Sequence, residues 1–208
     1  MPDIHPTAVV HPAATLADNV VVGPMCIVEE HVSIGPDSRL VAQCYVTGYT
    51  SIGARNVIHP GAVIGGEPQD YAFDPACVSY LEIGDDNIFR EGVSVHRGTK
   101  PGNTTRIGSN CFFMGYTHVA HDCQVGNGFV IVNGSGLTGY VTIGDNVFIS
   151  GNAGVHQFCR VGRLSMLSGG TYISKDLPPF MIADGRNEAV RSPNLVGMRR
   201  RNFSRDTI

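Results

Sequence analysis

The sequence contains no tryptophan, and lysine accounts for two of its 15 basic residues. The formal net charge of −3 excludes a broad electrostatic attraction to nucleic acid. No apolar run approaches the roughly 18 residues of a membrane-spanning helix, and residues 1–4 show no basic stretch leading into an apolar one, as a secretion signal would. We therefore expect a cytoplasmic protein that neither spans a membrane nor binds nucleic acid.

Cysteine occurs six times, but no Cys-x-x-Cys pair is present. Five of the six share one position of a six-residue repeat, a position that prefers small side chains: Cys26, Cys44, Cys111, Cys123 and Cys159. This placement favours buried thiols over a disulfide framework or a zinc-binding cluster.

The chain is rich in glycine, with 26 residues, and only 16% of its positions are charged, a composition typical of turn-rich β structure. Aliphatic residues, with an occasional phenylalanine, recur at every sixth position over two long stretches. The first ladder runs from Ile4 to Ile64 and the second from Ile107 to Ile173. An internal repeat of this length decides the architecture before any weaker signal is considered.

Glycine follows the repeated aliphatic residue at Ile107, Val125, Ile143 and Val161, which are spaced 18 residues apart. Three six-residue repeats therefore make one coil. A short strand on each of three sides, a turn at each corner and an aliphatic side chain pointing inward satisfy all of these spacings. The pattern predicts an all-β fold, a parallel β-helix of hexapeptide repeats.

The ladder is interrupted at about residues 65–80 and 97–105, where we expect loops that leave the coil. It stops near residue 176, because Pro178 and Pro179 cannot donate ladder hydrogen bonds. We therefore expect a β-helix over residues 1–176 and a basic tail over residues 177–208. The tail contains a helix-start pattern, with Ser192 as the cap and Pro193 at the first helical position.

Two histidines and an aspartate stand together in the second ladder, between Gly115 and Cys123. Residues 18 apart stack on one side of the coil, so Val119, Leu137 and Val155 should lie about 5 Å apart from coil to coil. A second loop of about one six-residue repeat would add Val95 to this column. The register brings together the polar residues and glycine that flank the column: His96, His118, His121, Gly139, His156 and Gln157.

This cluster suits acid–base chemistry. A partly exposed histidine such as His121, with Asp122 beside it to fix its tautomer, can act as a general base. The backbone N–H groups of Gly136 and Gly139, one coil away, can meet a developing oxyanion. Two alternatives stay open: ordinary turn histidines, which this repeat tolerates elsewhere, and a zinc site made by His96, His118 and His121.

Six segments in chain order carry a resemblance that covers essentially the whole sequence. They are Pro68-Gln69-Asp70, His96-Arg97-Gly98-Thr99, HVAHDC (118–123), AGVHQFC (153–159), DLPP (176–179) and RRNFSR (200–205). Many acyltransferases share a hexapeptide ladder, whereas these segments together resemble the UDP-N-acetylglucosamine O-acyltransferase family of lipid A biosynthesis. The resemblance implies a left-handed coil and a homotrimer.

The resemblance also implies a reaction, in which a 3-hydroxy fatty acyl group moves from acyl carrier protein to the 3-position of UDP-N-acetylglucosamine, the first step of lipid A biosynthesis. It implies no metal, and no cofactor beyond the carrier's phosphopantetheine. His121 would act as base, Asp122 would orient it, and the Gly139 N–H would stabilise the oxyanion. The resemblance also implies substrate contacts. Gln69 and Asp70 would contact the acceptor, and His96, His118, His156 and Gln157 would contact the sugar and acyl groups. Gly169 would meet the end of the acyl chain, and Asn194, Arg200 and Arg201 would bind nucleotide or pantetheine phosphates.

Three positions depart from the family pattern: Tyr140 replaces a histidine, Ala72 a lysine and Val196 a glutamate. The family also continues past the FSR segment into a helical domain, most of which we expect this chain to lack. Three other functions therefore stay open. They are an acyltransferase for a 3-amino UDP-sugar, an acetyl-CoA-dependent sugar acetyltransferase, and a trimer that binds without catalysis.

Overall fold

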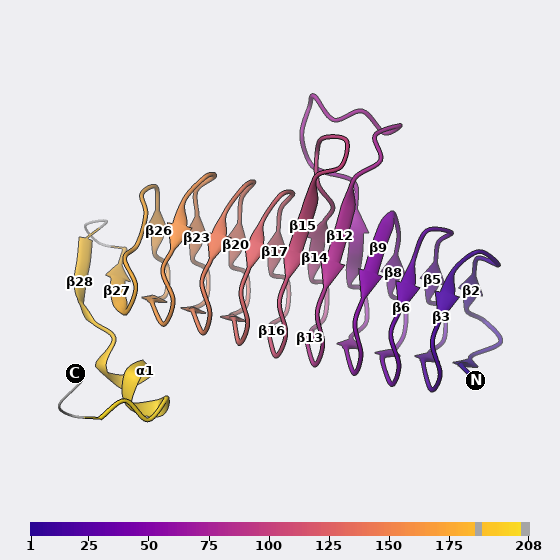
Figure 1. Cartoon of the computed structure of the whole chain (residues 1–208), viewed down its shortest axis with the longest axis horizontal. Helices are drawn as coiled ribbons and strands as arrows, with labels where there is room; N and C mark the ends of the chain where they lie inside the picture. Colours follow the sequence, from indigo (N-terminus) through magenta and orange to yellow (C-terminus); the bar gives the residue numbers. More distant parts are fainter. Residues whose placement is uncertain (186–188, 205–208) are drawn as a thin grey trace.

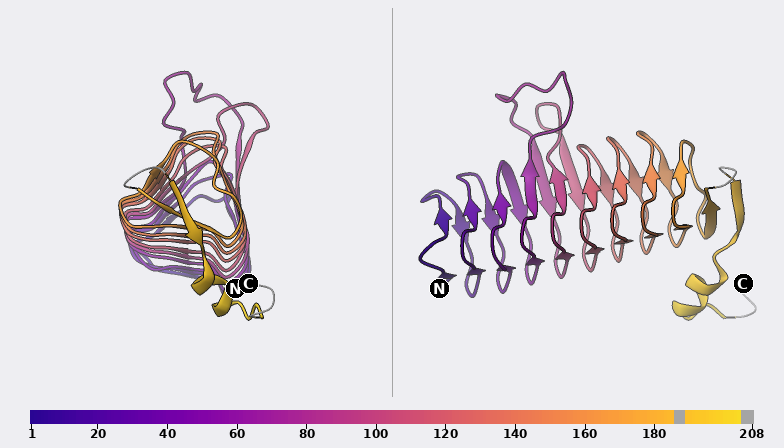
Figure 2. Two further views of the ribbon diagram at one scale, coloured as in Figure 1. Left: turned by 90° about the vertical axis from the view of Figure 1, so that its left-hand side faces the viewer. Right: turned by 180° about the vertical axis from the view of Figure 1, so that it is seen from behind.

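The computed structural model describes residues 1–185 and 189–204, which form a three-sided prism of short parallel strands with two longer strands and a helix at one end (Figure 1). Seen along its long axis, the coil is triangular, with one sheet on each side (Figure 2). From β1 to β27 consecutive strands belong to different sheets, and most of these strands pair with the strand three positions later in the chain. The predicted all-β parallel β-helix is confirmed.

The first sheet has 11 strands: β1 (Asp3–Ile4), β4 (Val21–Val22), β7 (Arg39–Leu40), β10 (Val57–Ile58), β13 (Ile88–Phe89), β16 (Phe112–Phe113), β19 (Val130–Ile131), β22 (Phe148–Ile149), β25 (Met166–Leu167), β27 (Met181–Asp184) and β28 (Ala189–Pro193). The second sheet has nine: β2 (Val9–Val10), β5 (Ile27–Val28), β8 (Tyr45–Val46), β11 (Val63–Gly66), β14 (Ser94–His96), β17 (His118–Val119), β20 (Gly136–Leu137), β23 (Gly154–Val155) and β26 (Tyr172–Ile173). The third sheet has eight: β3 (Thr15–Leu16), β6 (Ser33–Ile34), β9 (Tyr49–Ile52), β12 (Tyr80–Ile83), β15 (Thr104–Ile107), β18 (Gln124–Val125), β21 (Thr142–Ile143) and β24 (Arg160–Val161).

Each two-residue strand directs one side chain outward and the next inward, because side chains alternate across a pleated strand. The inward residue is the ladder residue, and over most of the prism it is fully buried, as Ile58, Leu137 and Leu167 are. Phenylalanines extend the core between coils: the rings of Phe89 and Phe113 stack with their centroids 4.7 Å apart. The ladder therefore supplies the hydrophobic core that holds the coil together.

The two insertions lengthen consecutive coils, and the strand pairing continues past them with one irregularity, a bulge between Ile64 and Gly66. Strand partners are usually 18 residues apart, as Val21 and Arg39 are, but Val57 pairs with Ile88 and Ile88 with Phe112. The first loop connects β11 to β12 and the second connects β14 to β15, so both project from the corner between the second and third sheets (Figure 1).

The pairing of Val95 with Val119 shows that the second insertion is one hexapeptide long. The prediction that Val95 joins the column and brings His96 with it is therefore confirmed.

The corner between the second and third sheets repeats one unusual backbone conformation. Asp122, Tyr140 and Phe158 occupy it in three successive coils, with φ of 61°, 61° and 66°. A non-glycine residue in this left-handed region costs roughly 1–2 kcal/mol, so the surrounding ladder must enforce the turn. As a result three side chains stand in a row along this corner, and the rings of Tyr140 and Phe158 stack 5.0 Å apart.

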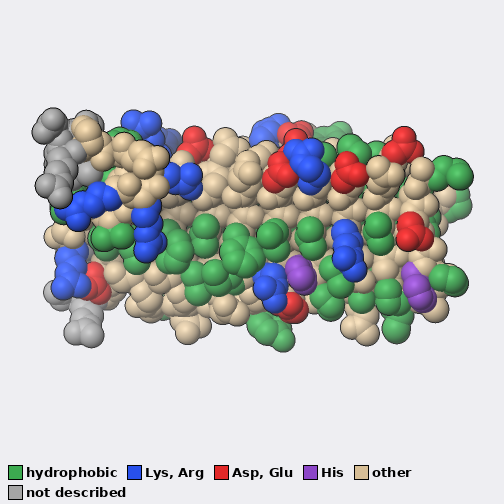
Figure 3. All heavy atoms as spheres, turned by 90° about the horizontal axis from the view of Figure 1, so that it is seen from below, with side chains coloured by type: hydrophobic (Ala, Val, Ile, Leu, Met, Phe, Trp, Pro, Cys, Tyr) green, Lys and Arg blue, Asp and Glu red, His purple; other side chains and the backbone are tan. Residues whose placement is uncertain are grey.

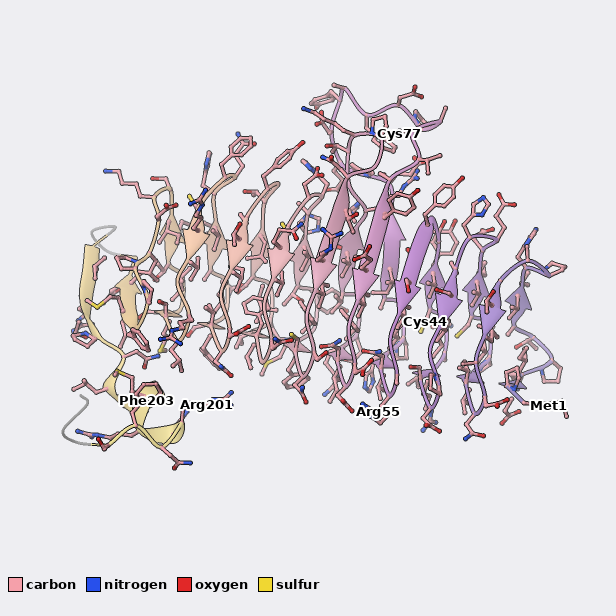
Figure 4. The ribbon with its side chains drawn as sticks, viewed as in Figure 1. Met1, Cys44, Arg55, Cys77, Arg201 and Phe203 are labelled. Atoms are coloured by element: carbon pink, nitrogen blue, oxygen red, sulfur yellow. The ribbon has the colours of Figure 1, made fainter. Side chains whose placement is uncertain are left out.

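All six cysteines are free and buried, which confirms the prediction of buried thiols. Cys44 lies within the prism, whereas Cys77 lies in the first loop, above the corner (Figure 4).

The prism continues past the boundary expected at residue 176. β27 pairs in parallel with β25 and so adds a further strand to the first sheet, and β28 then pairs with β27 in the antiparallel direction. The first part of the predicted tail is thus sheet.

No helix within residues 1–185 and 189–204 is long and apolar enough to cross a membrane.

The tail does contain a helix, α1 (Leu195–Arg200), but its cap differs from the prediction. Asn194 is the cap, and its side-chain oxygen accepts a hydrogen bond from the Gly197 N–H at 3.0 Å. The prediction of a cap at Ser192 is wrong, because strand pairing with Ile182 holds Ser192 in β28.

Candidate active site

The candidate site lies at the corner between the second and third sheets, beneath the two loops. β17 ends at Val119, and the turn that follows carries His121 and Asp122. His121 Nδ1 and Asp122 Oδ2 are 2.8 Å apart, with 13% and 5% of the two side chains exposed. A carboxylate can only accept a hydrogen bond, so Nδ1 carries the hydrogen and Nε2 keeps its lone pair. The histidine is therefore in the tautomer that a general base needs.

The second loop holds the Asp122 carboxylate. Thr99 donates to Oδ2 through its backbone N–H at 3.1 Å and its hydroxyl at 2.7 Å, and Asn103 Nδ2 donates to Oδ1 at 2.7 Å. Burial alone would raise the pKa of this carboxyl, but the hydrogen bonds from Thr99, His121 and Asn103 outweigh it and hold the pKa below its ordinary value. Asp122 is thus an ionised, fixed partner for His121 at neutral pH.

Gly139 lies against the imidazole of His121. A Cβ at this position would be 2.4 Å from His121 Cε1 and 2.7 Å from Nε2, so no side chain fits. Among the described residues the Gly139 N–H has no hydrogen-bond partner, whereas the Gly136 N–H donates to the Ala153 carbonyl at 3.0 Å. Of the two glycines considered as oxyanion donors, Gly139 can serve and Gly136 is committed to the ladder.

Tyr140 completes a chain of hydrogen bonds that ends on Asp122. Its ring meets His121 edge-on with centroids 5.4 Å apart, and its hydroxyl is 2.9 Å from Thr99 Oγ1. Because the Thr99 hydroxyl proton goes to Asp122, the Tyr140 hydroxyl is the donor to Thr99. Tyr140, at the position where the family pattern has histidine, therefore helps to hold the His121–Asp122 pair.

His118 and His96 form a neutral pair beside this corner. His118 Nδ1 is 2.8 Å from Ser94 Oγ, and the two imidazoles meet edge-on with centroids 5.0 Å apart. Burial, with smaller contributions from His96 and His121, lowers the pKa of His118 to about 4. Burial also lowers the pKa of His96, whose Nδ1 donates to the Glu67 carbonyl. Both rings are uncharged at neutral pH and can hydrogen-bond to neutral hydroxyl or carbonyl groups.

The two loops lie beside each other above the corner (Figure 1) and are linked by hydrogen bonds. The Ser79 hydroxyl donates to the Gly98 carbonyl, and the Cys77 thiol lies 3.6 Å from the Thr99 carbonyl. Arg97 is buried beneath the first loop and donates to the Cys77 carbonyl at 3.1 Å. The first loop therefore rests on the residues that hold Asp122.

Gln69 and Asp70, predicted to contact the acceptor, lie exposed at the start of the first loop. Asp70 caps the turn that follows, since its Oδ1 accepts from the Ala72 N–H at 2.9 Å. Asp70 Oδ1 is therefore used within the loop, whereas the Gln69 side chain is exposed to solvent and can meet a ligand.

A groove runs from His118 along the outer face of the second sheet. Gly136 and Gly154 occupy the outward positions of the next two coils, and the missing side chains leave a volume of about 330 Å³. His156 lies at its edge and its Nδ1 donates to the Gln157 carbonyl at 3.2 Å; both residues are exposed. The structure thus brings the groove, both residues and His121 to one side of the prism.

Four predicted site residues lie elsewhere. Gly169 is in the turn after β25, on the corner between the first and second sheets. Asn194 is 6% exposed, and its amide is occupied by Gly197 and by the Leu164 carbonyl, to which Nδ2 donates at 2.8 Å. Arg200 and Arg201 are exposed at the end of α1, on the opposite edge of the prism from the loops (Figure 1). A single chain does not bring these residues to His121.

Thr99 and Asn103 received no role from sequence reasoning, although both contact Asp122. The length of the second insertion could have predicted these contacts. One added hexapeptide keeps the register, so the loop that carries Thr99 and Asn103 lies across the corner from Asp122.

The described residues contain no group of three or more His, Cys, Asp or Glu side chains arranged to hold a metal ion. The histidines of the zinc alternative direct Nδ1 to different partners: His96 to Glu67, His118 to Ser94 and His121 to Asp122.

Comparison with known proteins first defines the class. Residues 104–139 match the family of bacterial transferase hexapeptide (six repeats), and residues 176–208 match domain 2 of UDP N-acetylglucosamine O-acyltransferase. These matches place the chain among the hexapeptide-repeat transferases.

Individual relatives define the family. Acyl-[acyl-carrier-protein]–UDP-N-acetylglucosamine O-acyltransferases from Syntrophobacter fumaroxidans and Saccharophagus degradans are 47% and 48% identical, in each case over 99% of this chain and 80% of the relative. The structure of LpxA from Acinetobacter baumannii superposes with a TM-score of 0.95 at 41% identity, covering 99% of this chain and 80% of that one. The chain belongs to the acyl-[acyl-carrier-protein]–UDP-N-acetylglucosamine O-acyltransferase family, and its fold is the left-handed parallel β-helix that the sequence resemblance implied.

Proposed function

We propose that this protein transfers a 3-hydroxy fatty acyl group from acyl carrier protein to the 3-hydroxyl of UDP-N-acetylglucosamine, the first step of lipid A biosynthesis. The names of the relatives reported above describe O-acyl transfer between acyl carrier protein and UDP-N-acetylglucosamine. The observation that supports it most directly is the corner itself, where a histidine with a free Nε2 faces an unpaired glycine N–H at the start of an uncharged groove.

In the proposed reaction, His121 Nε2 takes the proton of the sugar 3-hydroxyl while that oxygen attacks the thioester carbonyl carbon. The Gly139 N–H stabilises the oxyanion of the tetrahedral intermediate. The intermediate collapses with cleavage of the carbon–sulfur bond, and the imidazolium of His121 returns the proton to the leaving thiolate. Asp122, kept ionised by Thr99 and Asn103, stabilises the imidazolium between the two steps.

The remaining groups at the corner divide between the two substrates. His118 and His96, both neutral, face the position of the sugar, and Gln69 and Asp70 extend over it from the first loop. On the acyl side His156 lines the groove, and the exposed Gln157 follows it in the chain. No cofactor beyond the carrier's phosphopantetheine enters this scheme, and the proposal places the reaction in the cytoplasm.

The proposal includes a homotrimer. The outward residues of the first sheet form an apolar stripe, visible as hydrophobic side chains along the face in Figure 3 and made up of Val57, Ile88, Phe112, Val130, Phe148 and Met166. Burying this stripe against a second copy removes apolar surface from water. In such a trimer, Asn194, Arg200 and Arg201 of one subunit could lie near His121 of the next subunit, although they do not lie near His121 of their own chain.

The test supplies purified protein with a 3-hydroxyacyl carrier thioester and UDP-N-acetylglucosamine, and measures thiol release and product mass. We expect a sugar ester from the wild type. His121→Ala should slow release by about 10²- to 10⁴-fold, since it removes the general base. His11→Ala, a change at an exposed turn histidine in the N-terminal coils, is the matched control and should leave the rate unchanged.

The same assay separates the alternatives. An amide product from a 3-amino sugar, with no ester from UDP-N-acetylglucosamine, would identify the amino-sugar enzyme. Turnover with acetyl-CoA alone would identify an acetyltransferase. Carrier binding without thiol release, or equal rates for the wild type and His121→Ala, would refute the proposed chemistry.

A further inference from the structure

The first loop, which connects β11 to β12 over residues 67–79, contains three acidic residues and no lysine or arginine. It rises from the prism above the corner between the second and third sheets (Figure 1). A cation from another part of the chain can offset the repulsion between its carboxylates. The structure places such a cation, Arg97 of the second loop, beneath it.

Arg97 contacts the first loop at its start, middle and end. Its Nη2 lies 3.8 Å from Glu67 Oε1, its guanidinium carbon lies 5.2 Å from the centroid of the Phe73 ring, and its Nη1 donates to the Cys77 carbonyl at 3.1 Å. The residue is 6% exposed. Because a buried charge is costly without partners, Arg97 and the loop hold each other in place.

The prism fixes the other end of Arg97. Its backbone N–H donates to the Gly66 carbonyl at 3.1 Å, at the end of β11. Gly48 has φ of 66°, and a Cβ there would be only 3.1 Å from Arg97 Cδ, so the missing side chain leaves room for the arginine stem. The guanidinium is therefore presented to the loop from a defined position.

The contacts of Arg97 flank the two loop residues that the proposed function assigns to the acceptor. Glu67 precedes Gln69 by two residues. On the other side, the Phe73 N–H donates to the Asp70 carbonyl at 3.1 Å. A shift of the Phe73 ring away from the guanidinium would therefore also move the turn that carries Asp70.

We propose that Arg97 is a positioning residue for the acceptor, which fixes the first loop so that Gln69 and Asp70 are in place before the UDP-sugar binds. The inference rests on the proposed function, because that function assigns these two residues to the acceptor. Binding to an ordered loop avoids the entropic cost of ordering it. Within the described part of the chain, the side-chain contacts of Arg97 are with the first loop and not with His121 or Asp122.

The experiment measures steady-state kinetics of the whole protein with the sugar and the thioester varied in turn, and binding of UDP-N-acetylglucosamine by calorimetry. Arg97→Met keeps an apolar stem without the charge and should raise the sugar KM and Kd about 10- to 100-fold. The thioester KM, and kcat at saturating sugar, should change by less than about twofold, because only binding of the sugar is affected. Arg97→Lys keeps the charge without the planar fork and should recover part of the loss.

Two further variants complete the design. Arg55→Met makes the same chemical change at an exposed arginine that is paired with Asp86, and it should leave both KM values unchanged. Phe73→Leu removes the ring beside the guanidinium and should raise the sugar KM in the same direction as Arg97→Met. It supplies the test should Arg97→Met fail to fold.

An unchanged sugar KM in either folded variant would overturn the inference. So would a lower kcat at unchanged KM, because Arg97 would then act on the His121–Asp122 pair instead of the acceptor loop. Failure of the proposed function looks different: the wild type itself would form no sugar ester from UDP-N-acetylglucosamine.

Discussion

Removing the hydroxyl of Thr99 tests whether the second loop prepares the catalytic pair. Thr99→Val deletes the 2.7 Å hydrogen bond to Asp122 Oδ2 and the contact with the Tyr140 hydroxyl. It retains the backbone N–H bond at 3.1 Å and nearly the same side-chain shape. The change therefore removes one of the hydrogen bonds to the buried Asp122 carboxylate, together with the link from Tyr140 to it.

The size of the effect follows from that bond. A hydrogen bond to a charged group contributes about 1.5–3 kcal/mol, so losing it from the transition state should lower kcat about 10- to 150-fold. The bond favours the ionised form of Asp122, so its loss raises the pKa of this carboxyl. The acidic limb of the profile of kcat/KM against pH should accordingly move to higher pH.

The assay is thiol release across a pH series, with circular dichroism to confirm that each variant is folded. Thr99→Ser restores a hydroxyl and should recover most of the rate. Thr142→Val makes the same chemical change on an exposed position of β21 and should leave the profile unchanged. A Thr99→Val enzyme with wild-type kcat and an unmoved acidic limb would show that the loop does not prepare Asp122.

Three further outcomes are expected. Burial lowers the pKa of His118 to about 4 in the fold, so the unfolded chain takes up this proton first as the pH falls from about 6.5 to about 4. Across that window the free energy of unfolding, measured with urea, should fall by about 3 kcal/mol more for the wild type than for His118→Gln. Equal losses in the two proteins would contradict the burial argument. Gly139→Ala drives a Cβ into the imidazole and should abolish most turnover in a folded protein, whereas an active enzyme would remove Gly139 from the mechanism. Ile88→Asp charges the apolar stripe and should reduce the mass in sedimentation to that of one chain, whereas Val9→Asp, on the second sheet, should not.

The fold was predictable because the hexapeptide period is set by the prism itself. Each inward residue, such as Val119 or Leu137, must be apolar, so the register of the whole coil can be counted from the sequence. The same count placed His96 in the column, because an insertion of one full repeat preserves the register.

What the period does not govern could not be predicted. The loop contacts of Thr99 and Asn103 depend on a backbone path that no repeat specifies. The helix cap shifted from Ser192 to Asn194 because strand pairing overrode a local helix signal.

The two glycines illustrate the limit within the repeat. Gly136 and Gly139 looked equivalent as oxyanion donors, but one lies in a strand and the other in a turn. The ladder uses the N–H of the first and leaves that of the second free. The position of each glycine within the hexapeptide therefore decides whether its N–H is free to donate to an oxyanion.

The order of the coils has a consequence for how this enzyme can diversify. The loop that carries Gln69 and Asp70 inserts on the N-terminal side of His121, whereas the groove beside His118 extends through the coils on its C-terminal side as far as Tyr172. Neither region shares a strand with the other, and an inserted hexapeptide leaves the pairing beyond it intact. Substitutions in the loop and in the groove can thus accumulate independently along one axis, with the coil that carries His121 and Asp122 between them unchanged.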